Sequence, residues 1–164
     1  MKRILMICCA CSSYTMLISQ QGHVDRISES FEIYSDAIIS KDFKTAVSKS
    51  HPAIVELGGG EVYVIDDLQR DHDMYAAIGV HTIKMEAKQP SKVIEAGNEL
   101  HAMLPVEHYM KTPVDTTQTT QYYLAVSRDE GSSWYFVDMK RHDESSIKVF
   151  LPNYDDRLNV YLRQ

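Results

Sequence analysis

The chain has 164 residues and a formal net charge of −6, with 17 Lys and Arg against 23 Asp and Glu. Proteins whose main partner is a nucleic acid or an anionic membrane need a basic face, so this charge balance argues against both. The length fits one domain with a single core. Ten tyrosines supply large side chains with a polar tip, which suit clefts and interfaces as well as cores.

The N-terminal segment has the composition of an export signal. Met1-Lys2-Arg3 is a short basic start, and the run from Ile4 to Ile18 carries no charge and is mostly apolar. A basic stretch followed by an apolar stretch is typical of a leader that is removed on export. The apolar run spans about 15 residues, fewer than the roughly 20 that a membrane-spanning helix needs. We therefore assign residues 1–20 to a leader and residues 22–164 to one exported domain.

The cysteines leave the processing of this leader open. All three, Cys8, Cys9 and Cys11, lie inside it. In one interpretation Cys11, preceded by Ala10, becomes the lipidated first residue of a lipoprotein in the cell envelope. In another, a signal peptidase cuts between Cys11 and Gln21 and releases a periplasmic or secreted protein. The remaining alternative is a buried N-terminal element of a cytosolic protein.

Helical periodicity follows the leader. Between residues 24 and 40, Ile27, Phe31, Tyr34 and Ile38 recur at spacings of four, three and four, which predicts an amphipathic helix. Shorter helical pieces are expected through Val47 and again from Pro52 to Leu57, because proline is tolerated in a first helical turn. A further long helix is expected over residues 61–77, after the two short pieces.

From residue 79 the hydrophobic period changes to two, which predicts strands. The expected strands cover residues 81–87, 93–96, 99–111, 116–127 and 134–139. The third of these has Leu104, Val106 and His108 on one face, and Pro105 within it indicates an edge position or a bulge. A final helical turn is expected over residues 144–151, where Pro152 stops it.

Helices followed by antiparallel strands predict an α+β fold. The chain resembles the nuclear-transport-factor-two-like superfamily over about residues 24–140. The resemblance rests on the step Ala37-Ile38-Ile39-Ser40-Lys41-Asp42-Phe43 at the end of the first helix and on Gly131-Ser132-Ser133-Trp134-Tyr135-Phe136-Val137-Asp138. The latter is similar to the Gly-x-x-Trp-x-aromatic-x-Asp ending of many members. The tail Phe150-Leu151-Pro152-Asn153 is similar to that of secreted bacterial members.

This resemblance implies a cone-shaped α+β roll, in which N-terminal helices pack in a strongly curved, mostly antiparallel sheet with a pocket at the wide end. It also implies a homodimer formed through the open sheet face. The superfamily contains ketosteroid isomerases, polyketide cyclases and dehydratases as well as binding modules without catalytic activity, so the fold alone does not decide the function.

The candidate pocket residues are polar or aromatic groups expected on strand or helix faces. They are His108, His81, Asp138, Tyr34, Tyr63, Tyr123 and Trp134. A histidine on an apolar face is more often a hydrogen-bonded core residue than a catalyst, and an aspartate at a strand end is more often a turn residue. A catalytic version of the site would use His108 or Asp138 as base and Tyr34, Tyr63 or Tyr123 as hydrogen-bond donor.

No spacing in the sequence indicates a metal or cofactor site. Asp71, His72 and Asp73 are adjacent on a predicted helix and point in different directions, and no cysteine outside the leader accompanies the histidines. We therefore expect no cofactor, no metal and no catalytic constellation. The sequence favours an exported, non-catalytic domain that binds a small apolar molecule, a peptide or a protein. The alternatives are a small pocket enzyme of isomerase or dehydratase type and an immunity or inhibitor protein against a secreted toxin.

Overall fold

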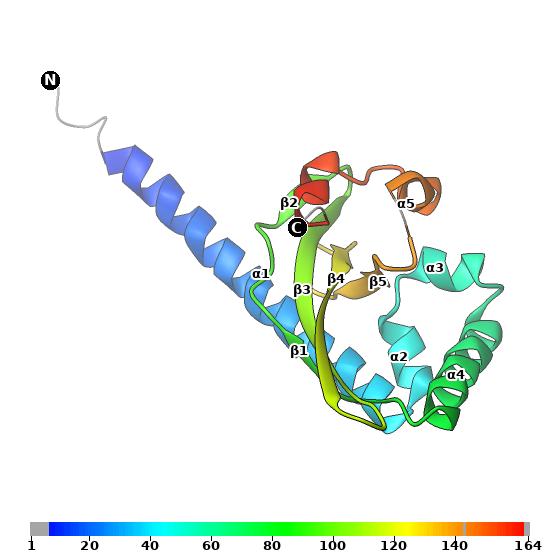
Figure 1. Ribbon diagram of the computed structural model, residues 1–164. Helices are drawn as coiled ribbons and strands as arrows, with labels where there is room; N and C mark the ends of the chain where they lie inside the picture. Colours follow the sequence, from blue (N-terminus) through cyan, green and yellow to red (C-terminus); the bar gives the residue numbers. More distant parts are fainter. Residues whose placement is uncertain (1–6, 143, 163–164) are drawn as a thin grey trace, which may run out of the picture.

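The computed structural model describes residues 7–142 and 144–162, and its longest element is the helix α1 (Ile7–Ser40). Ile27 and Phe31 are 0% and 1% exposed, and Tyr34 and Ile38 pack against the same core, which confirms the predicted stripe. The helix begins at Ile7 and not near residue 24, so its N-terminal part extends beyond the sheet (Figure 1).

Three helices follow, at the positions that the sequence predicted. They are α2 (Phe43–Lys49), α3 (Pro52–Leu57) and α4 (Glu61–Ala77). The Asp42 carboxylate caps α2 by accepting a hydrogen bond from the backbone N–H of Thr45 at 3.1 Å. The His51 imidazole caps α3 in the same way, through Nδ1 and the N–H of Ala53 at 3.3 Å. Of these helices α2 buries Phe43, Ala46 and Val47, whereas neither α3 nor α4 has a fully buried residue.

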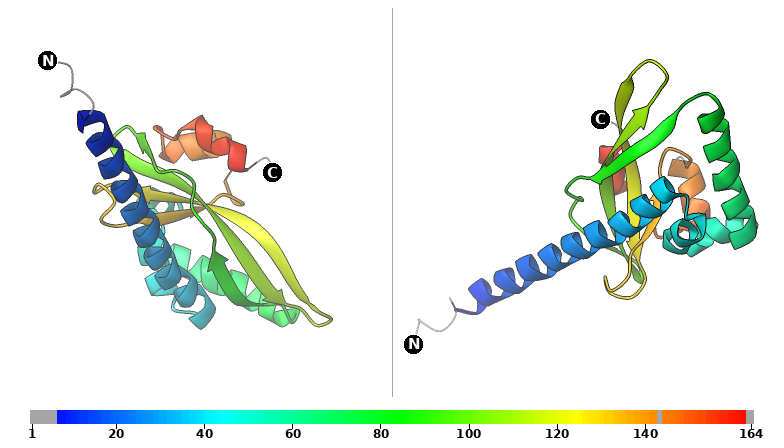
Figure 2. Two further views of the ribbon diagram at one scale, coloured as in Figure 1. Left: turned by 90° about the vertical axis from the view of Figure 1, so that its left-hand side faces the viewer. Right: turned by 90° about the horizontal axis from the view of Figure 1, so that it is seen from below.

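The five strands form one antiparallel sheet. They are β1 (His81–Ala87), β2 (Ile94–Ala96), β3 (Glu99–Lys111), β4 (Thr116–Ser127) and β5 (Tyr135–Asp138). Their order is β1-β3-β4-β5, and β2 pairs with β3 beyond the end of β1. The sheet is strongly curved into a half-barrel with helices against it, which confirms the predicted α+β fold class (Figures 1 and 2).

Pro105 does not mark a sheet edge, because β3 is an interior strand with β4 on one side and β1 and β2 on the other. The Pro105 carbonyl accepts a hydrogen bond from the N–H of Lys88 at 2.8 Å, so the backbone nitrogen of Pro105 faces the same side. That side is the gap between β1, which ends at Ala87, and β2, which begins at Ile94. A missing N–H donor is tolerated there because no regular strand opposes it.

The inward face predicted for β1 is wrong at the start of this strand. The register shifts between Thr82 and Lys84, so Ile83 is an extra residue that opposes no partner and is 48% exposed. A β-bulge of this kind reverses the side to which the residues before it point. As a result His81 is exposed, and Met85 is the residue of β1 that enters the core.

The sheet separates two hydrophobic cores, whereas the chain length predicted one. The first lies between α1 and the sheet and contains Ile27, Phe31, Leu104, Trp134 and Phe136 among others. The second lies on the opposite face under α5 (Glu144–Phe150) and the 3-10 helix η1 (Asp156–Tyr161). It contains Met103, Leu124, Val126, Val137, Ile147, Leu151 and Leu158. Both faces of β3 near Ala102 to Leu104 and of the last part of β4 are therefore buried, and the C-terminal segment completes the second core.

No helix in the described part of the chain combines the length and hydrophobicity that a membrane span requires.

Candidate functional site

Two of the predicted pocket residues meet on the α1 side of the sheet. His108 of β3 and Tyr123 of β4 are 7% and 3% exposed. The Tyr123 hydroxyl lies 3.2 Å from Nε2 of His108, within hydrogen-bond distance, and the two rings are parallel with centroids 5.8 Å apart. A neutral imidazole accepts a hydrogen bond at one of its two nitrogens, so the tyrosine hydroxyl can donate a hydrogen bond to Nε2 when that nitrogen carries no proton.

Aromatic side chains surround this pair and fill the space between α1 and the sheet. Phe31 lies 5.2 Å from Tyr123 and 5.1 Å from Phe136 between ring centroids, in edge-to-face geometry. The ring centroid of Tyr34 lies 5.9 Å from that of Tyr123 and 5.8 Å from that of Phe136. Such pairs are favourable contacts in a core. The environment of His108 and Tyr123 is therefore packed and largely apolar.

Burial shifts the protonation of these groups toward their neutral forms. Desolvation lowers the pKa of His108, although the Asp138 carboxylate opposes this effect. Desolvation raises the pKa of Tyr34 and of Tyr123, with a further increase from Asp138 and an opposite effect from Arg141. At neutral pH the histidine and both phenols are therefore uncharged, which is how buried polar groups avoid the penalty of an isolated charge.

Asp138 ends β5 and turns the chain toward α5. Its carboxylate accepts a hydrogen bond from the N–H of Lys140 at 2.9 Å and lies 3.7 Å from Nε of Arg141. Arg141 also pairs with Asp71 of α4, with Nη2 at 2.6 Å from the carboxylate. Burial would lower the pKa of Arg141, but the pairing with Asp71 and Asp138 raises it overall. Arg141 thus connects the end of the sheet to α4.

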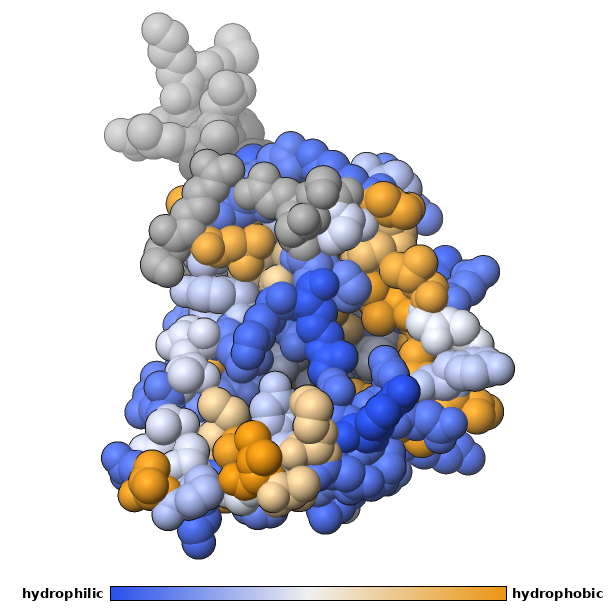
Figure 3. Space-filling view, turned by 45° about the vertical axis from the view of Figure 1, so that its right-hand side comes forward, coloured by the Kyte–Doolittle hydropathy of each residue, from blue (hydrophilic) through white to orange (hydrophobic). Residues whose placement is uncertain are grey.

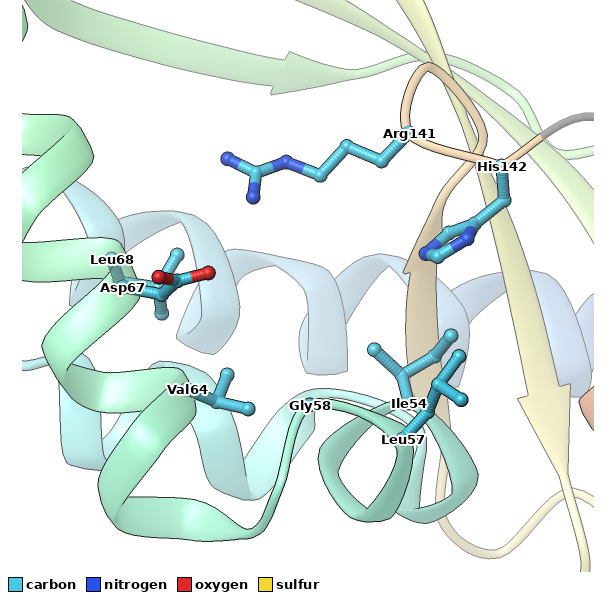
Figure 4. A pocket seen from close by; sticks show the side chains of 8 residues that line it. All are labelled: Ile54, Leu57, Gly58, Val64, Asp67, Leu68, Arg141 and His142. Atoms are coloured by element: carbon cyan, nitrogen blue, oxygen red, sulfur yellow. The ribbon is translucent and has the colours of Figure 1, made fainter.

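Arg141 also reaches into a pocket of about 210 Å³, here called the α3–α4 pocket. Its lining consists of Ile54, Leu57, Gly58, Val64, Asp67, Leu68, Arg141 and His142. Figure 4 shows Ile54 and Leu57 on α3, Val64, Asp67 and Leu68 on α4, and Arg141 extending across the space from the segment after β5. Four aliphatic side chains therefore face one guanidinium group.

The charges around the α3–α4 pocket are close to balanced. Asp71 and Asp138 flank Arg141, and Asp67 forms an ion pair with Arg70 on the same helix. The carboxylates outnumber the guanidinium groups, so no surplus positive charge attracts an anion. Figure 3 shows this side of the molecule, where strongly hydrophilic residues (blue) cross a hollowed surface that has hydrophobic residues (orange) on both sides.

The other candidates from the sequence lie elsewhere. His81 is exposed at the start of β1, opposite Lys111 of β3. Tyr63 is 68% exposed near the start of α4 and is not part of the pocket lining. Trp134 is fully buried in the first core, and its indole Nε1 donates a hydrogen bond to the carbonyl of Gly131 at 3.2 Å. The side chain of Cys11 lies outside the described part of the structure.

Sequence reasoning missed Arg141 and the pocket that it lines. Arg141 follows a strand in a short polar segment, and nothing in the local pattern distinguishes it from other surface charges. Its role depends on contacts with Asp71, 70 residues earlier in the chain. The Gly58-Gly59-Gly60 corner, which turns α3 into α4, is the one sequence signal near the pocket.

Among the side chains that the structure describes, those of residues 20–142 and 146–162, no three from His, Cys, Asp or Glu lie together in a way that could hold a metal ion. No protein-family model matches the sequence, and no curated protein matches it significantly. The functional argument therefore rests on the fold, on the His108–Tyr123 pair and on the α3–α4 pocket.

Proposed function

We propose that this protein is an exported, non-catalytic binding domain of the nuclear-transport-factor-two-like kind, and that its α3–α4 pocket takes a small, mainly apolar, uncharged molecule. The observation that carries this proposal is the pocket of about 210 Å³ with four aliphatic side chains opposite Arg141. An enclosed apolar cavity of about 150 Å³ is large enough to bind benzene. The α3–α4 pocket has a comparable volume but is half open to solvent, so it would enclose a substituted ring only in part.

The polar side of the pocket specifies the kind of ligand. Arg141 has five N–H donors, and the contacts with Asp71 and Asp138 involve Nη2 and Nε. The remaining N–H groups can donate to a carbonyl or hydroxyl oxygen of a ligand. A carboxylate ligand would gain little, because Asp71 and Asp138 already neutralise the Arg141 guanidinium and Arg70 is paired with Asp67.

The export part of this proposal rests on the leader composition and is consistent with how α1 is attached. The side-chain amide of Gln20 forms two hydrogen bonds with the backbone of Val93, each 3.2 Å long, which fix α1 to the segment before β2. A cut before Gln20 would leave this attachment and the α1 stripe intact, whereas removal of all of residues 1–20 would remove Gln20 and both hydrogen bonds but keep the stripe. The intact mass of the mature protein from its native host tests this part, since an unprocessed Met1 would contradict export.

Acetophenone is a suitable probe for the pocket, because it is an uncharged ring with one carbonyl oxygen. We expect it to bind with a Kd of about 1 mM, a typical affinity for a ligand of this size. Replacing Leu68 with tryptophan should fill the pocket and weaken binding at least tenfold, as measured by saturation-transfer NMR. Val62→Trp is the matched control, since Val62 is 69% exposed on the same helix and does not line the pocket.

Benzoate is the charged comparison ligand, because it has a similar ring but carries a negative charge. We expect benzoate to bind more weakly than acetophenone. Equal saturation transfer to acetophenone in the wild type and the Leu68→Trp variant would show that the pocket is not the binding site. Tighter binding of benzoate would contradict the charge argument.

A second candidate, a small pocket enzyme of isomerase or dehydratase type, is favoured by one observation. The hydrogen-bonded pair of His108 and Tyr123 places a neutral base next to a phenol, with the Asp138 carboxylate close enough to influence both. This function requires a substrate to reach the pair between the aromatic rings of Phe31 and Tyr34. A ligand that perturbs the His108 ring and leaves α4 unchanged would favour this candidate.

A further inference from the structure

One edge of the sheet is open along half of β4. The last strand, β5, pairs only with residues Tyr123 to Val126 of β4. The preceding stretch, residues 116–121, has β3 on one side and no strand of the described part of the chain on the other, and its first five residues are all exposed. We call this stretch the open edge. Figure 2 shows the hairpin of β3 and β4 projecting from the rest of the sheet, with its turn near the segment that joins α4 to β1.

The hydrogen bonds of β4 determine which backbone groups face the open side. The carbonyl of Tyr122 accepts a hydrogen bond from the N–H of Met139 at 3.0 Å, so the backbone of Tyr122 faces the β5 side. Backbone groups in a strand alternate sides, so Thr116, Gln118 and Thr120 also face this side. The N–H of Thr116 is bonded to the Asp115 carboxylate at 2.6 Å. The backbone groups of Gln118 and Thr120 face solvent.

The two edges of the sheet differ in their protection against pairing. On the opposite edge, β1 contains the bulge between Thr82 and Lys84, and Glu86 forms ion pairs with Lys84 and Lys88 at 2.7 and 2.9 Å. Bulges and charged side chains are the usual means of blocking edge-to-edge association. The open edge has neither, since its sequence is Thr-Thr-Gln-Thr-Thr-Gln. It is therefore the edge that can accept another strand.

We propose that the open edge pairs with the same edge of a second copy of this chain, antiparallel and with the two-fold axis at Gln118. Two observations favour a second copy over another partner. The open edge lacks charge, so identical copies do not repel one another there. Residues 116–120 read Thr-Thr-Gln-Thr-Thr in both directions. In an antiparallel pair of identical strands each threonine therefore lies opposite a threonine, as an isologous interface requires.

The geometry of β4 fixes the register of this dimer. Strands paired about Gln118 place Gln118 opposite Gln118 and Thr116 opposite Thr120, and all of these residues direct backbone groups to the open side. The two Gln118 residues exchange two hydrogen bonds, and each Thr120 N–H donates to the carbonyl of Thr116 in the other copy. Thr117 and Thr119 face each other as close side-chain pairs, which are favourable on a sheet.

This contact is small, so the dimer should be weak. Interfaces below about 1,200 Å² are usually transient. On the opposite side of the sheet β1 is protected, and β2 and β5 are short strands of three and four residues, so the open edge is the longest stretch available for pairing. Association should stop at the dimer and should depend on protein concentration.

Charge substitutions at the two-fold axis test the proposal with the full-length protein. Gln118→Lys places two like charges opposite each other, and Gln118→Glu does the same with the opposite sign. Neither removes a backbone hydrogen bond. Sedimentation velocity is measured over a concentration series, with reductant present so that Cys8, Cys9 and Cys11 do not cross-link the chains. Asn98→Lys, at an exposed turn between β2 and β3, is the control for added charge.

We expect the wild type and Asn98→Lys to dimerise as the concentration rises, and each Gln118 variant to stay monomeric at least tenfold higher in concentration. An equimolar mixture of Gln118→Lys and Gln118→Glu should form dimers again, because opposite charges then meet at the axis. A wild type that is monomeric at every concentration would overturn the proposal. So would a dimer that both variants leave unchanged, or a mixture that fails to dimerise.

Discussion

Replacing Trp134 with alanine should lower the free energy of unfolding by about 3 to 5 kcal/mol, the usual loss when a buried tryptophan is truncated. Trp134 is fully buried in the core between α1 and the sheet. Its ring lies edge-on to His23 of α1, with centroids 6.0 Å apart, and its indole N–H bonds the carbonyl of Gly131. The same carbonyl accepts a hydrogen bond from Arg26 at 3.1 Å. The substitution therefore loosens the attachment of α1 as well as the core.

Urea unfolding followed by far-ultraviolet circular dichroism measures this loss, since Trp134 is the single tryptophan and its fluorescence is lost with it. Tyr63→Ala is the matched control, because Tyr63 is 68% exposed and should change stability by less than about 0.5 kcal/mol. Trp134→Phe should lose less than Trp134→Ala. A loss below about 1 kcal/mol for Trp134→Ala would show that the core does not depend on this ring.

Lowering the pH from 7 to 5 should reduce the free energy of unfolding by about 1 to 2 kcal/mol, mainly through His51. Desolvation lowers the pKa of His51 to about 4, with opposing influence from Glu99 and smaller support from Arg128 and His101. The unfolded chain binds the proton with the ordinary pKa near 6.5. The stabilising effect of the neutral form is therefore complete above pH 6.5 and is lost as the pH falls toward 4.

His101 and His108 contribute in the same direction, since burial lowers the pKa of both. The carboxylates whose pKa values are lowered, such as Glu86 and Asp155, act only below about pH 4.5 and do not affect this window.

His51→Asn is the informative variant for this pH dependence. Asparagine can still cap α3 through the N–H of Ala53, but it does not titrate. Urea unfolding at pH 7, 6 and 5 should show that the variant loses at least a third less stability than the wild type. Equal stability of the wild type at pH 7 and pH 5 would contradict the argument, as would a variant with the full loss.

Local patterns in the sequence were sufficient to predict most of the elements. The stripe of Ile27 and Phe31 identified the buried face of α1, and the alternation across Leu104 and Val106 identified β3 with its bounds. Both signals depend only on the period of one element. The fold class followed from the order of these elements along the chain.

The errors concern features that depend on distant parts of the chain. Pro105 lies opposite a gap between two other strands, and this gap cannot be inferred from β3 alone. His81 is exposed because the bulge at Ile83 reverses the face of the sheet to which the side chains before it point. The second core requires η1, whose short irregular segment around Leu158 has no period long enough to recognise.

The candidate site was predicted only in part, because local patterns identify the face of one element but not its contacts with distant parts of the chain. His108 and Tyr123 stand on predicted strand faces, and the structure brings them into hydrogen-bond distance. The α3–α4 pocket depends on how α4 lies against α3 and on the reach of Arg141 from the opposite side. Neither of these follows from the helical pattern of residues 61–77.

Binding of a small uncharged molecule in the α3–α4 pocket is best tested by chemical-shift mapping of the isotope-labelled protein during a titration with acetophenone. We expect the largest amide shifts on α3 and α4, around Ile54, Gly58, Val64 and Leu68, and we expect Leu68→Trp to abolish them. Shifts centred on His108 and Tyr123, or none at all, would contradict it.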